Sequence, residues 1–508
     1  MDISLKHENY KFLKTNKENS VEEIVEAEFS LPEYLPEILR IIKSTAEPKI
    51  HSCNLVGERI TVDGVCDLKM LYTAEDGGIY SFSTSKPFTR HCENKDFSDA
   101  VDVNASLKVS YVNCRATSTK RAEIKAGLTI KFNVFFEEKE DIISIEDGKC
   151  IEQKSVCVDV ASLGCKKTRS FSLSDTVALQ KGASFIVSSD ACAVLTETRK
   201  INNKIMVKGD AIVDICYVNS SDKSTTETIK HIIPINQILE FEGMEEHFNG
   251  SVILNISALE IIPKGESNGA SSNLDISLGI DVSISMWEEK QVNVISDAYA
   301  IGSAIELKKN NYEFLSLLAE INDNFIYDTS FSVSGEGVSC VLSKWAEITG
   351  VVAKTEGDNL IVTGNISVSL LIKDNANSLS CINKMFDFSY SQRNEKFDDN
   401  IVFEPCIVLS SLACKVKGEN NIELRAEINI SGSVFKKMKL DVVTEIYESD
   451  KPFVCNKNAI TVYFPQEKNE SLWGIARKYN TTVRAIAAEN DLDGDTTGNL
   501  KMLFIPSA

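Results

Sequence analysis

A serine between two glycines is the first place in this sequence where a nucleophile could sit. Gly265-Glu266-Ser267-Asn268-Gly269 has the form Gly-x-Ser-x-Gly. Such a serine is catalytic when a strand precedes it, a helix follows it and an oxyanion hole faces it. Here Ala270-Ser271-Ser272-Asn273 follows, and then a strand pattern. The segment therefore predicts a flexible hairpin loop and not a nucleophile elbow.

Metal and nucleotide sites also lack the spacing they need. The five histidines show no His-x-x-x-His or Cys/His ligand spacing. Gly335-Glu336-Gly337 lacks the third glycine of a dinucleotide loop, and no Gly-Lys-Ser/Thr loop is present. A triad assembled from distant residues stays open, although no motif indicates one. We expect no enzyme activity, no ATP hydrolysis, no metal and no cofactor.

The composition is typical of a multidomain globular protein. The 508 residues, 43% of them hydrophobic, predict about three to five domains. A net charge of −20 argues against a general nucleic-acid or anionic-membrane binder, although a local basic patch stays open. The polar start and the lack of a long apolar run predict a cytoplasmic protein with no secretory signal and no transmembrane segment. The 14 cysteines form no Cys-x-x-Cys pair, so we expect free, mostly buried thiols.

Two alternating runs recur three times along the chain. Arg59–Gly64, Lys204–Gly209 and Asn359–Gly364 share the order Ile/Leu-x-Val-x-Gly, with glycines 145 and 155 residues apart. A second run is found at Ala122–Val134, Leu274–Ile284 and Ile422–Ile430. A period of two places the apolar side chains on one sheet face. The sequence predicts three copies of a β-rich, sandwich-like domain, and the glycine predicts a bulge or a close backbone approach.

The segments outside these runs are less regular. Residues 1–25 are charged and aperiodic, which predicts a loose arm. Pro36 suits the start of a short helix with Ile38, Ile41 and Ile42 on one face. Residues 137–154 and 263–273 are rich in charge or in Gly and Ser, which predicts loops or connectors.

Residues 456–508 have a different pattern, in the order strand, helix, helix, strand. Ser471 and Thr482 can each cap a helix. An inward stripe at helical spacing comprises Leu472, Ile475, Ala476 and Tyr479. Trp473 lies one position outside this stripe, and it is either an interface anchor or a cover over the sheet. Arg477, Lys478 and Arg484 either steer an acidic partner or form an ordinary solvated face.

This C-terminal segment resembles a LysM domain. The resemblance rests on four segments: Ile460-Thr461-Val462, residues 471–483, Asn490-x-Leu492 and Leu503-Phe504-Ile505-Pro506. LysM domains usually bind N-acetylglucosamine polymers through two loops. In this sequence Asn469-Glu470-Ser471 replaces the usual Gly-Asp-Thr, and Thr497-Gly498 replaces Pro-Gly, which argues against glycan binding.

The three upstream copies resemble SPOCS domains, which are found in clostridial spore-coat proteins. The resemblance rests on Leu35-Pro36-Glu37-Ile38-Leu39, residues 46–50, Ile60-x-Val62-x-Gly64 and Leu71-Tyr72. SPOCS copies followed by one LysM domain resemble the SipL family. The resemblance implies a mainly β protein with SPOCS-like domains at residues 26–145, 165–290 and 310–450, followed by a small α+β LysM domain at 456–508.

The family implies a coat-morphogenetic scaffold in the mother-cell cytoplasm, at the forespore surface. Its LysM domain would bind the stage IV sporulation protein A ATPase, and other coat proteins are possible partners. The residues expected at this interface are Trp473, Leu472, Ile475, Arg477, Lys478 and Arg484. One alternative is a peptidoglycan- or N-acetylglucosamine-binding LysM protein or cell-wall hydrolase. Another is a coat subunit that polymerises through strand edges.

Overall fold

The computed structural model describes residues 4–14, 19–147, 150–221, 225–267, 270–335, 337–449 and 460–506. Five predicted features therefore lie partly outside the described residues. They are the arm at 1–3 and 15–18, the connector at 148–149, the serine loop at 268–269, the glycine motif at Glu336, and the C-terminal domain at 456–459 and 507–508. The expected fold class is confirmed, because strands dominate and α-helices are described only near the C-terminus. Within these ranges, no helix has the length and apolarity needed to cross a bilayer.

Copy 1 is a sandwich of two antiparallel sheets. The inner sheet is β3 (Arg40–Val56), β4 (Arg59–Thr73) and β5 (Ile79–Glu93). The outer sheet contains β2 (Asn19–Ser30), β7 (Arg121–Asp147) and β6 (Ala100–Ser118). Alternate residues of β4 and β7 fill the space between the sheets, and Ile60, Val62, Ile124 and Ile130 are fully buried there. The predicted period of two is confirmed.

Copies 2 and 3 repeat this sandwich. Copy 2 comprises β8 (Ile151–Ile201), β9 (Lys204–Asn219), β10 (Thr226–Glu240), β11 (Asn249–Ser267) and β12 (Ala270–Ala300). Copy 3 comprises β13 (Ile305–Ser332), β14 (Val338–Glu356), β15 (Asn359–Asp374), β16 (Leu379–Arg393), β17 (Ile401–Phe403), β18 (Cys406–Lys417) and β19 (Asn421–Glu448). Each copy has its own core. Because β8 is long enough to pair with β9 at one end and with β12 at the other, the two layers of copy 2 share one sheet.

The repeated strand glycine permits a close backbone approach, as predicted. A Cβ on Gly209 would overlap the carbonyl oxygen of Val194, and one on Gly364 would lie 2.7 Å from the ring of Phe388. A β-bulge in the neighbouring strand lies opposite or next to each glycine. A bulge adds one residue to one strand and bends it, so a side chain at the glycine would obstruct the bent strand.

A second bulge in each copy moves one apolar side chain onto a shared axis. The extra residues are Ile42 in β3, Val187 in β8 and Leu342 in β14, each 22 residues before its strand glycine. They pack with Leu71, Cys216 and Leu371, each seven residues after that glycine. Equivalent positions of all three copies thus build one small core. The copies are arranged around a pseudo-threefold axis.

The edges of the inner sheets close a ring around this axis. β5 contacts β8, β10 contacts β14, and β16 contacts β3. Ser81 Oγ donates to Ile186 O at 3.3 Å, and the equivalent Thr226 Oγ1 donates to Leu342 O at 2.7 Å. Each copy therefore covers a strand edge of the next one, which leaves those edges unavailable for pairing with other chains.

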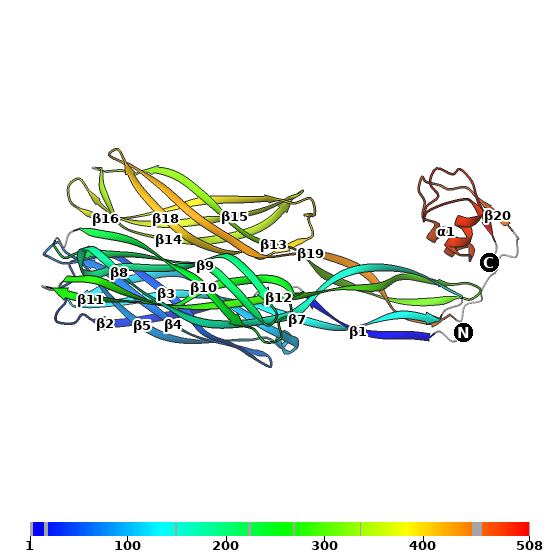
Figure 1. The fold of residues 1–508 in the computed structure, drawn as a ribbon, viewed down its shortest axis with the longest axis horizontal. Coiled ribbons are helices and arrows are strands. Elements are labelled where there is room, and N and C mark those ends of the chain that lie inside the picture. Colours follow the sequence, from blue (N-terminus) through cyan, green and yellow to red (C-terminus); the bar gives the residue numbers. More distant parts are fainter. Residues whose placement is uncertain are drawn as a thin grey trace.

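Strand ends from the three copies continue beyond the sandwiches and pack together in a segment that we call the stalk (Figure 1). It contains β1 (Ser4–Lys14) with the end of β7, the start of β8 with the end of β12, and the start of β13 with the end of β19. Its interior is apolar, and Phe12 and Phe314 meet edge to face at 5.1 Å between ring centroids. Phe12, Val158, Val294 and Val442 are buried.

The stalk corrects two predictions. The described part of residues 1–25 is β1 and the start of β2, not a loose arm, because Phe12 is anchored in the stalk interior. Residues 137–147 and 151–154 are strand and not loop, since Ile142 and Ile143 are buried against strands of the other copies. Charged residues are frequent in these segments, and they hid this burial from the pattern of the sequence.

Two further predictions need correction. Residues 36–42 form no helix, because Tyr72 Oη donates to Pro36 O at 3.0 Å and Ile38 N donates to Thr119 O at 2.7 Å, which ties the segment to neighbouring strands. Residues 263–273 are predicted to form a loop or connector, but 263–267 belong to β11 and 270–273 to β12, which pair as a hairpin. No disulfide is formed among the thirteen described cysteines. Nine of them are half-buried, three are buried and Cys157 is exposed, so the expectation of mostly buried thiols needs correction as well.

The C-terminal domain has the predicted order. It contains β20 (Ile460–Tyr463), α1 (Leu472–Tyr479), α2 (Val483–Glu489) and β21 (Leu503–Pro506). Thr482 Oγ1 accepts from Ala485 N at 2.9 Å and caps α2. Ser471 precedes α1, but its hydroxyl makes no capping bond. β20 pairs with β21, and both helices pack on this sheet.

The close approach at the strand glycine predicts a cost for any side chain there. Gly209→Ala is expected to lower the stability of copy 2 by about 1–3 kcal/mol, because the added methyl group overlaps the backbone of β8. The urea unfolding midpoint of the full chain measures this loss. In Gly494→Ala the new methyl group meets open space, so that variant should unfold like the wild type. Equal midpoints for all three proteins would contradict the packing described here.

Candidate functional site

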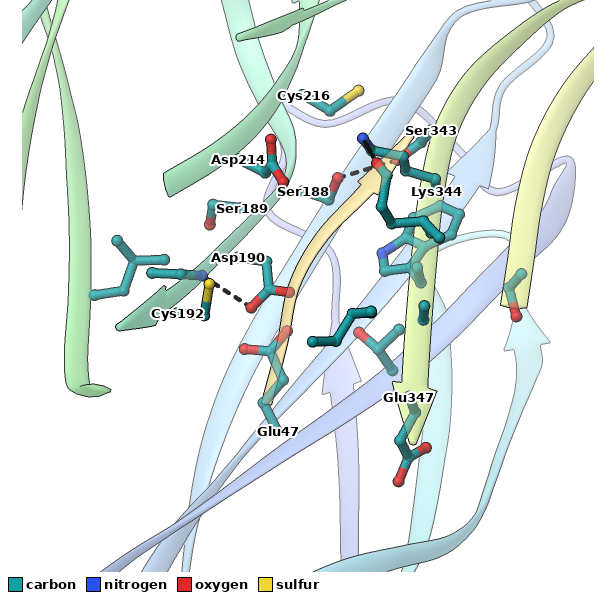
Figure 2. A pocket seen from close by; sticks show the side chains of 18 of the residues that line it. Glu47, Ser188, Ser189, Asp190, Cys192, Asp214, Cys216, Ser343, Lys344 and Glu347 are labelled. Carbon is teal, nitrogen blue, oxygen red and sulfur yellow. Dashed lines mark hydrogen bonds between the residues drawn. The ribbon is translucent and has the colours of Figure 1, made fainter. Parts of the chain in front are cut away.

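A polar cavity of 590 Å³ lies between the three copies (Figure 2). Its lining includes Lys43 and Glu47 from β3, Asp190 from β8, and Lys344 and Glu347 from β14. Lys43 Nζ donates to Ser369 Oγ at 2.8 Å, and Ser188 Oγ lies 3.1 Å from Ser343 Oγ. The cavity thus combines polar contacts from different copies.

Desolvation dominates the electrostatics of this cavity. Burial raises the pKa of Glu47 and Asp190, and each is raised further by another carboxylate nearby. Burial, followed by the charges of Asp190 and Asp214, raises the pKa of Cys192 to about 12, so this thiol stays protonated at neutral pH. In the described part of the chain, no group of three His, Cys, Asp or Glu side chains is arranged to hold a metal ion.

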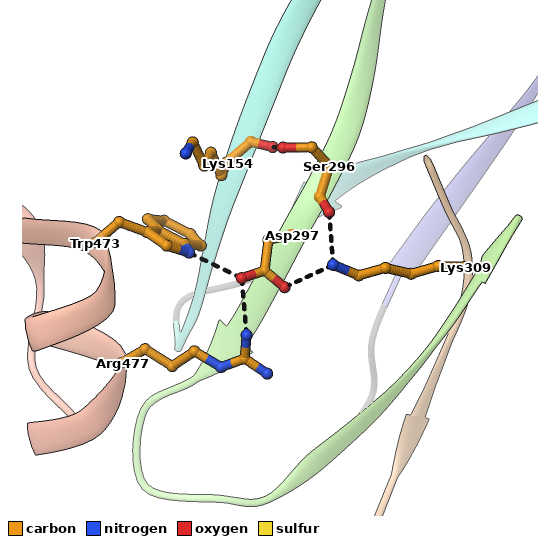
Figure 3. A network of polar contacts seen from close by, with 6 residues as sticks. All are labelled: Lys154, Ser296, Asp297, Lys309, Trp473 and Arg477. Atoms are coloured by element: carbon orange, nitrogen blue, oxygen red, sulfur yellow. Dashed lines mark hydrogen bonds and ion pairs between the residues drawn. The ribbon is translucent and has the colours of Figure 1, made fainter. Parts of the chain in front are cut away.

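The second candidate site is the face of α1 that carries Trp473. Trp473 is half-buried, and its Nε1 donates to Asp297 Oδ2 at 2.9 Å (Figure 3). Arg477 Nη1 donates to the same oxygen at 2.8 Å, and Lys309 Nζ donates to Asp297 Oδ1 at 3.1 Å. Burial raises the pKa of Asp297, but the bonds from Trp473 and Lys309 and the charge of Arg477 outweigh it, so the pKa lies below its usual value.

An aromatic contact accompanies these polar bonds. The rings of Tyr299 and Trp473 meet edge to face at 4.9 Å, and Tyr299 Oη donates to Thr481 O at 2.8 Å. Tyr299 is only 5% exposed and belongs to the apolar core of the C-terminal domain. Gly302 N, in the turn after β12, donates to Asn480 Oδ1 at 3.3 Å. The end of β12 therefore docks against the Trp473 face.

The other expected interface residues divide into two groups. Leu472 and Ile475 are 0% and 2% exposed, so they hold the core and cannot touch a partner directly. Lys478 and Arg484 are exposed, and Lys478 Nζ lies 5.4 Å from the ring centroid of Tyr479. The structure brings Trp473 and Arg477 together, whereas Arg484 lies on α2. Sequence reasoning missed Asp297 and Tyr299, because no spacing links β12 to a helix more than 170 residues away.

The two loops at the end of this domain are joined to each other. Leu472 N donates to Asp495 O at 2.9 Å, and Thr497 N donates to Glu470 O at 2.9 Å. The Glu470 carboxylate accepts from Tyr463 Oη at 2.8 Å and from Gln466 N at 3.1 Å. The Glu470 carboxylate and these backbone groups are thus engaged within the domain.

Ser267 also has a definite place. It pairs with Ala270 across the β11–β12 hairpin, and a strand follows where a nucleophile elbow needs a helix. The sequence-based interpretation as a hairpin is confirmed.

Burial separates core from surface in the C-terminal domain. Ile475→Ala is expected to destabilise this domain by about 2–5 kcal/mol, because it leaves a cavity among buried side chains. Arg484→Ala should change its stability by less than about 0.5 kcal/mol. Circular dichroism at 222 nm during unfolding is a suitable measurement, since both described α-helices belong to this domain. A larger loss in Arg484→Ala than in Ile475→Ala would contradict the assignment.

The axial carboxylates predict a pH dependence. The raised pKa of Asp190 means that folding favours its protonated form, so stability falls as pH rises through that pKa. Asp190→Asn should therefore raise the urea midpoint at neutral pH, and the gain should vanish below about pH 4. Asp63→Asn is the control, because hydrogen bonds from Thr89 and Ser52 hold the pKa of Asp63 low. A gain for Asp190→Asn that is independent of pH would contradict this cause.

Comparison with known families finds matches in three segments of the chain. The family described as "SipL, SPOCS domain" matches residues 37–117 and 184–262, within copies 1 and 2. The LysM domain family matches residues 467–501. No curated protein and no solved structure matches the chain. Copy 3 lies outside the matched segments, but it shares the glycine, the bulges and the sandwich of the other two. The chain therefore has the SipL-like architecture, with SPOCS domains followed by a C-terminal LysM domain.

Proposed function

We propose that this protein is a non-enzymatic scaffold of the spore coat, whose LysM domain holds the stage IV sporulation protein A ATPase. The SipL-type SPOCS domains favour a role in sporulation. The proposal places the protein in the mother-cell cytoplasm, at the forespore surface, where it would help to attach coat layers.

One observation favours a protein partner over a glycan. The Trp473 face of the LysM domain already contacts protein groups, namely the carboxylate of Asp297 and the ring of Tyr299. A half-buried tryptophan beside an arginine is typical of protein interface anchors. The Glu470 carboxylate, which stands in the first of the two loops, is already engaged by Tyr463 and Gln466 and supports the same choice.

Co-purification of the ATPase with the full chain tests this function. Trp473→Glu is expected to lose binding, because it places an anion where the face offers an indole N–H and an apolar ring. Lys501→Glu is the matched control, since Lys501 is exposed in the same domain outside the expected interface residues, and it should bind like the wild type. Circular dichroism must show that both variants keep their helices. ATPase binding retained by a folded Trp473→Glu variant would contradict the proposal and move the contact to the SPOCS copies.

The glycan-binding alternative is tested with insoluble peptidoglycan. The full chain is expected to remain in the supernatant at physiological salt. Sedimentation with peptidoglycan, if lost in Trp473→Glu, would favour a glycan-binding protein instead.

A further inference from the structure

The Trp473 face is occupied by a segment of the same chain. Asp297 and Tyr299, which we call the latch, lie two residues apart at the end of β12. Asp297 accepts from both Trp473 and Arg477, and Tyr299 packs against the Trp473 ring. Only 15% of the Asp297 side chain is exposed. The LysM surface that the proposed function assigns to a partner is therefore partly covered in this state, with Trp473 half-buried and Arg477 still exposed at its rim.

The latch shows which chemical groups this surface can bind. Trp473 and Arg477 offer two N–H donors that converge on one carboxylate oxygen, a charge-assisted arrangement that is stronger than a neutral hydrogen bond. Beside them, the Trp473 ring accepts the edge of another aromatic ring, and Thr481 O accepts a phenolic hydroxyl. The surface is thus complementary to an acidic side chain next to a tyrosine-like ring.

The contact is also suited to exchange. The contact between the LysM domain and the stalk comes from the short segment Asp297–Gly302. Among the described residues, it consists of a few hydrogen bonds and the apolar packing of Tyr299 and Ile301. In addition, Lys309 of β13 contacts Asp297, so the carboxylate keeps a cationic neighbour when Arg477 leaves. Opening therefore does not leave the Asp297 carboxylate as an unpaired buried charge, which would be strongly destabilising.

We propose that the latch is an internal substitute for the partner. The ATPase binds the LysM domain after the latch opens, and it offers an acidic side chain beside an aromatic ring in place of Asp297 and Tyr299. This inference rests on the proposed function. A partner that binds only the open state has an apparent affinity reduced by the fraction of molecules that are open. Weakening the latch must then strengthen partner binding.

Asp297→Lys in the full chain tests the proposal. The new cation faces Arg477 and Lys309, so the latch should open. Glu445→Lys is the matched control, because it reverses a charge on the stalk that pairs with Lys308 and that has no described contact with the LysM domain. Tyr299→Phe is a milder second variant that removes only the hydroxyl bond to Thr481. Urea midpoints check that all variants fold.

Two measurements are needed. Hydrogen–deuterium exchange without any partner reports the latch itself, through the Gly302 amide and helix α1, and exchange there should be faster in Asp297→Lys but not in Glu445→Lys. Titration with the ATPase reports its consequence, and the Kd should fall about fivefold or more in Asp297→Lys. Tyr299→Phe should change the exchange rate and the Kd in the same directions as Asp297→Lys, but by a smaller factor.

The outcomes separate the two claims. Unchanged exchange in Asp297→Lys, with the wild type still binding the ATPase, overturns the latch alone. Faster exchange with unchanged or weaker ATPase binding also overturns it, because the latch would not cover the partner surface. If neither wild type nor Asp297→Lys binds the ATPase, the proposed function fails and this inference fails with it.

Discussion

The bulges of β3, β8 and β14 are the constraint on which the rest of the structure depends. Each bulge adds one residue to its strand, namely Ile42, Val187 or Leu342. Without the bulges, these three side chains would be lost from the shared core. The extra residue directs each of them to the axis, while its neighbours continue to fill the sandwich. Each inner sheet therefore serves two cores, and the ring of sheet edges closes around the axis.

The axis also explains why charged residues are retained inside the molecule. Below the apolar cluster, the same three strands line the cavity with Glu47, Asp190 and Glu347. Burial raises the pKa of all three. These groups lower stability at neutral pH relative to neutral side chains, so the packing of the three copies is strongest only along the part of the axis that is apolar.

The sandwiches could be predicted from sequence, whereas the stalk could not. Ile60, Val62 and their equivalents alternate with polar residues and recur with a glycine at a fixed place, because each copy buries one face of its own sheet. In the stalk, a strand is buried only by strands of the other copies, so its own sequence is dominated by the charged outer face. Ile142 and Ile143, adjacent and both buried, follow no period of two.

The same limit applies to the candidate site. The helical stripe showed that Leu472 and Ile475 are inside and that Trp473 lies beside the core, because these are local relations on one helix. Asp297 and Tyr299 reach Trp473 only through the stalk, which is itself a tertiary feature. Of the six expected interface residues, two bond to Asp297, two are core residues and two are exposed without a described contact to β12. They are, in that order, Trp473 and Arg477, Leu472 and Ile475, and Lys478 and Arg484.

Because the three copies belong to one chain, the two ends of the molecule differ. Strand β12 has 31 residues and extends for about 100 Å at roughly 3.3 Å per residue. Its far end belongs to the β11–β12 hairpin, and its near end meets the LysM domain beside the described start of the chain (Figure 1). A homotrimer of this shape would carry three LysM domains. In the single chain one LysM domain lies at one pole, and a different surface, that of the sandwiches, lies at the other.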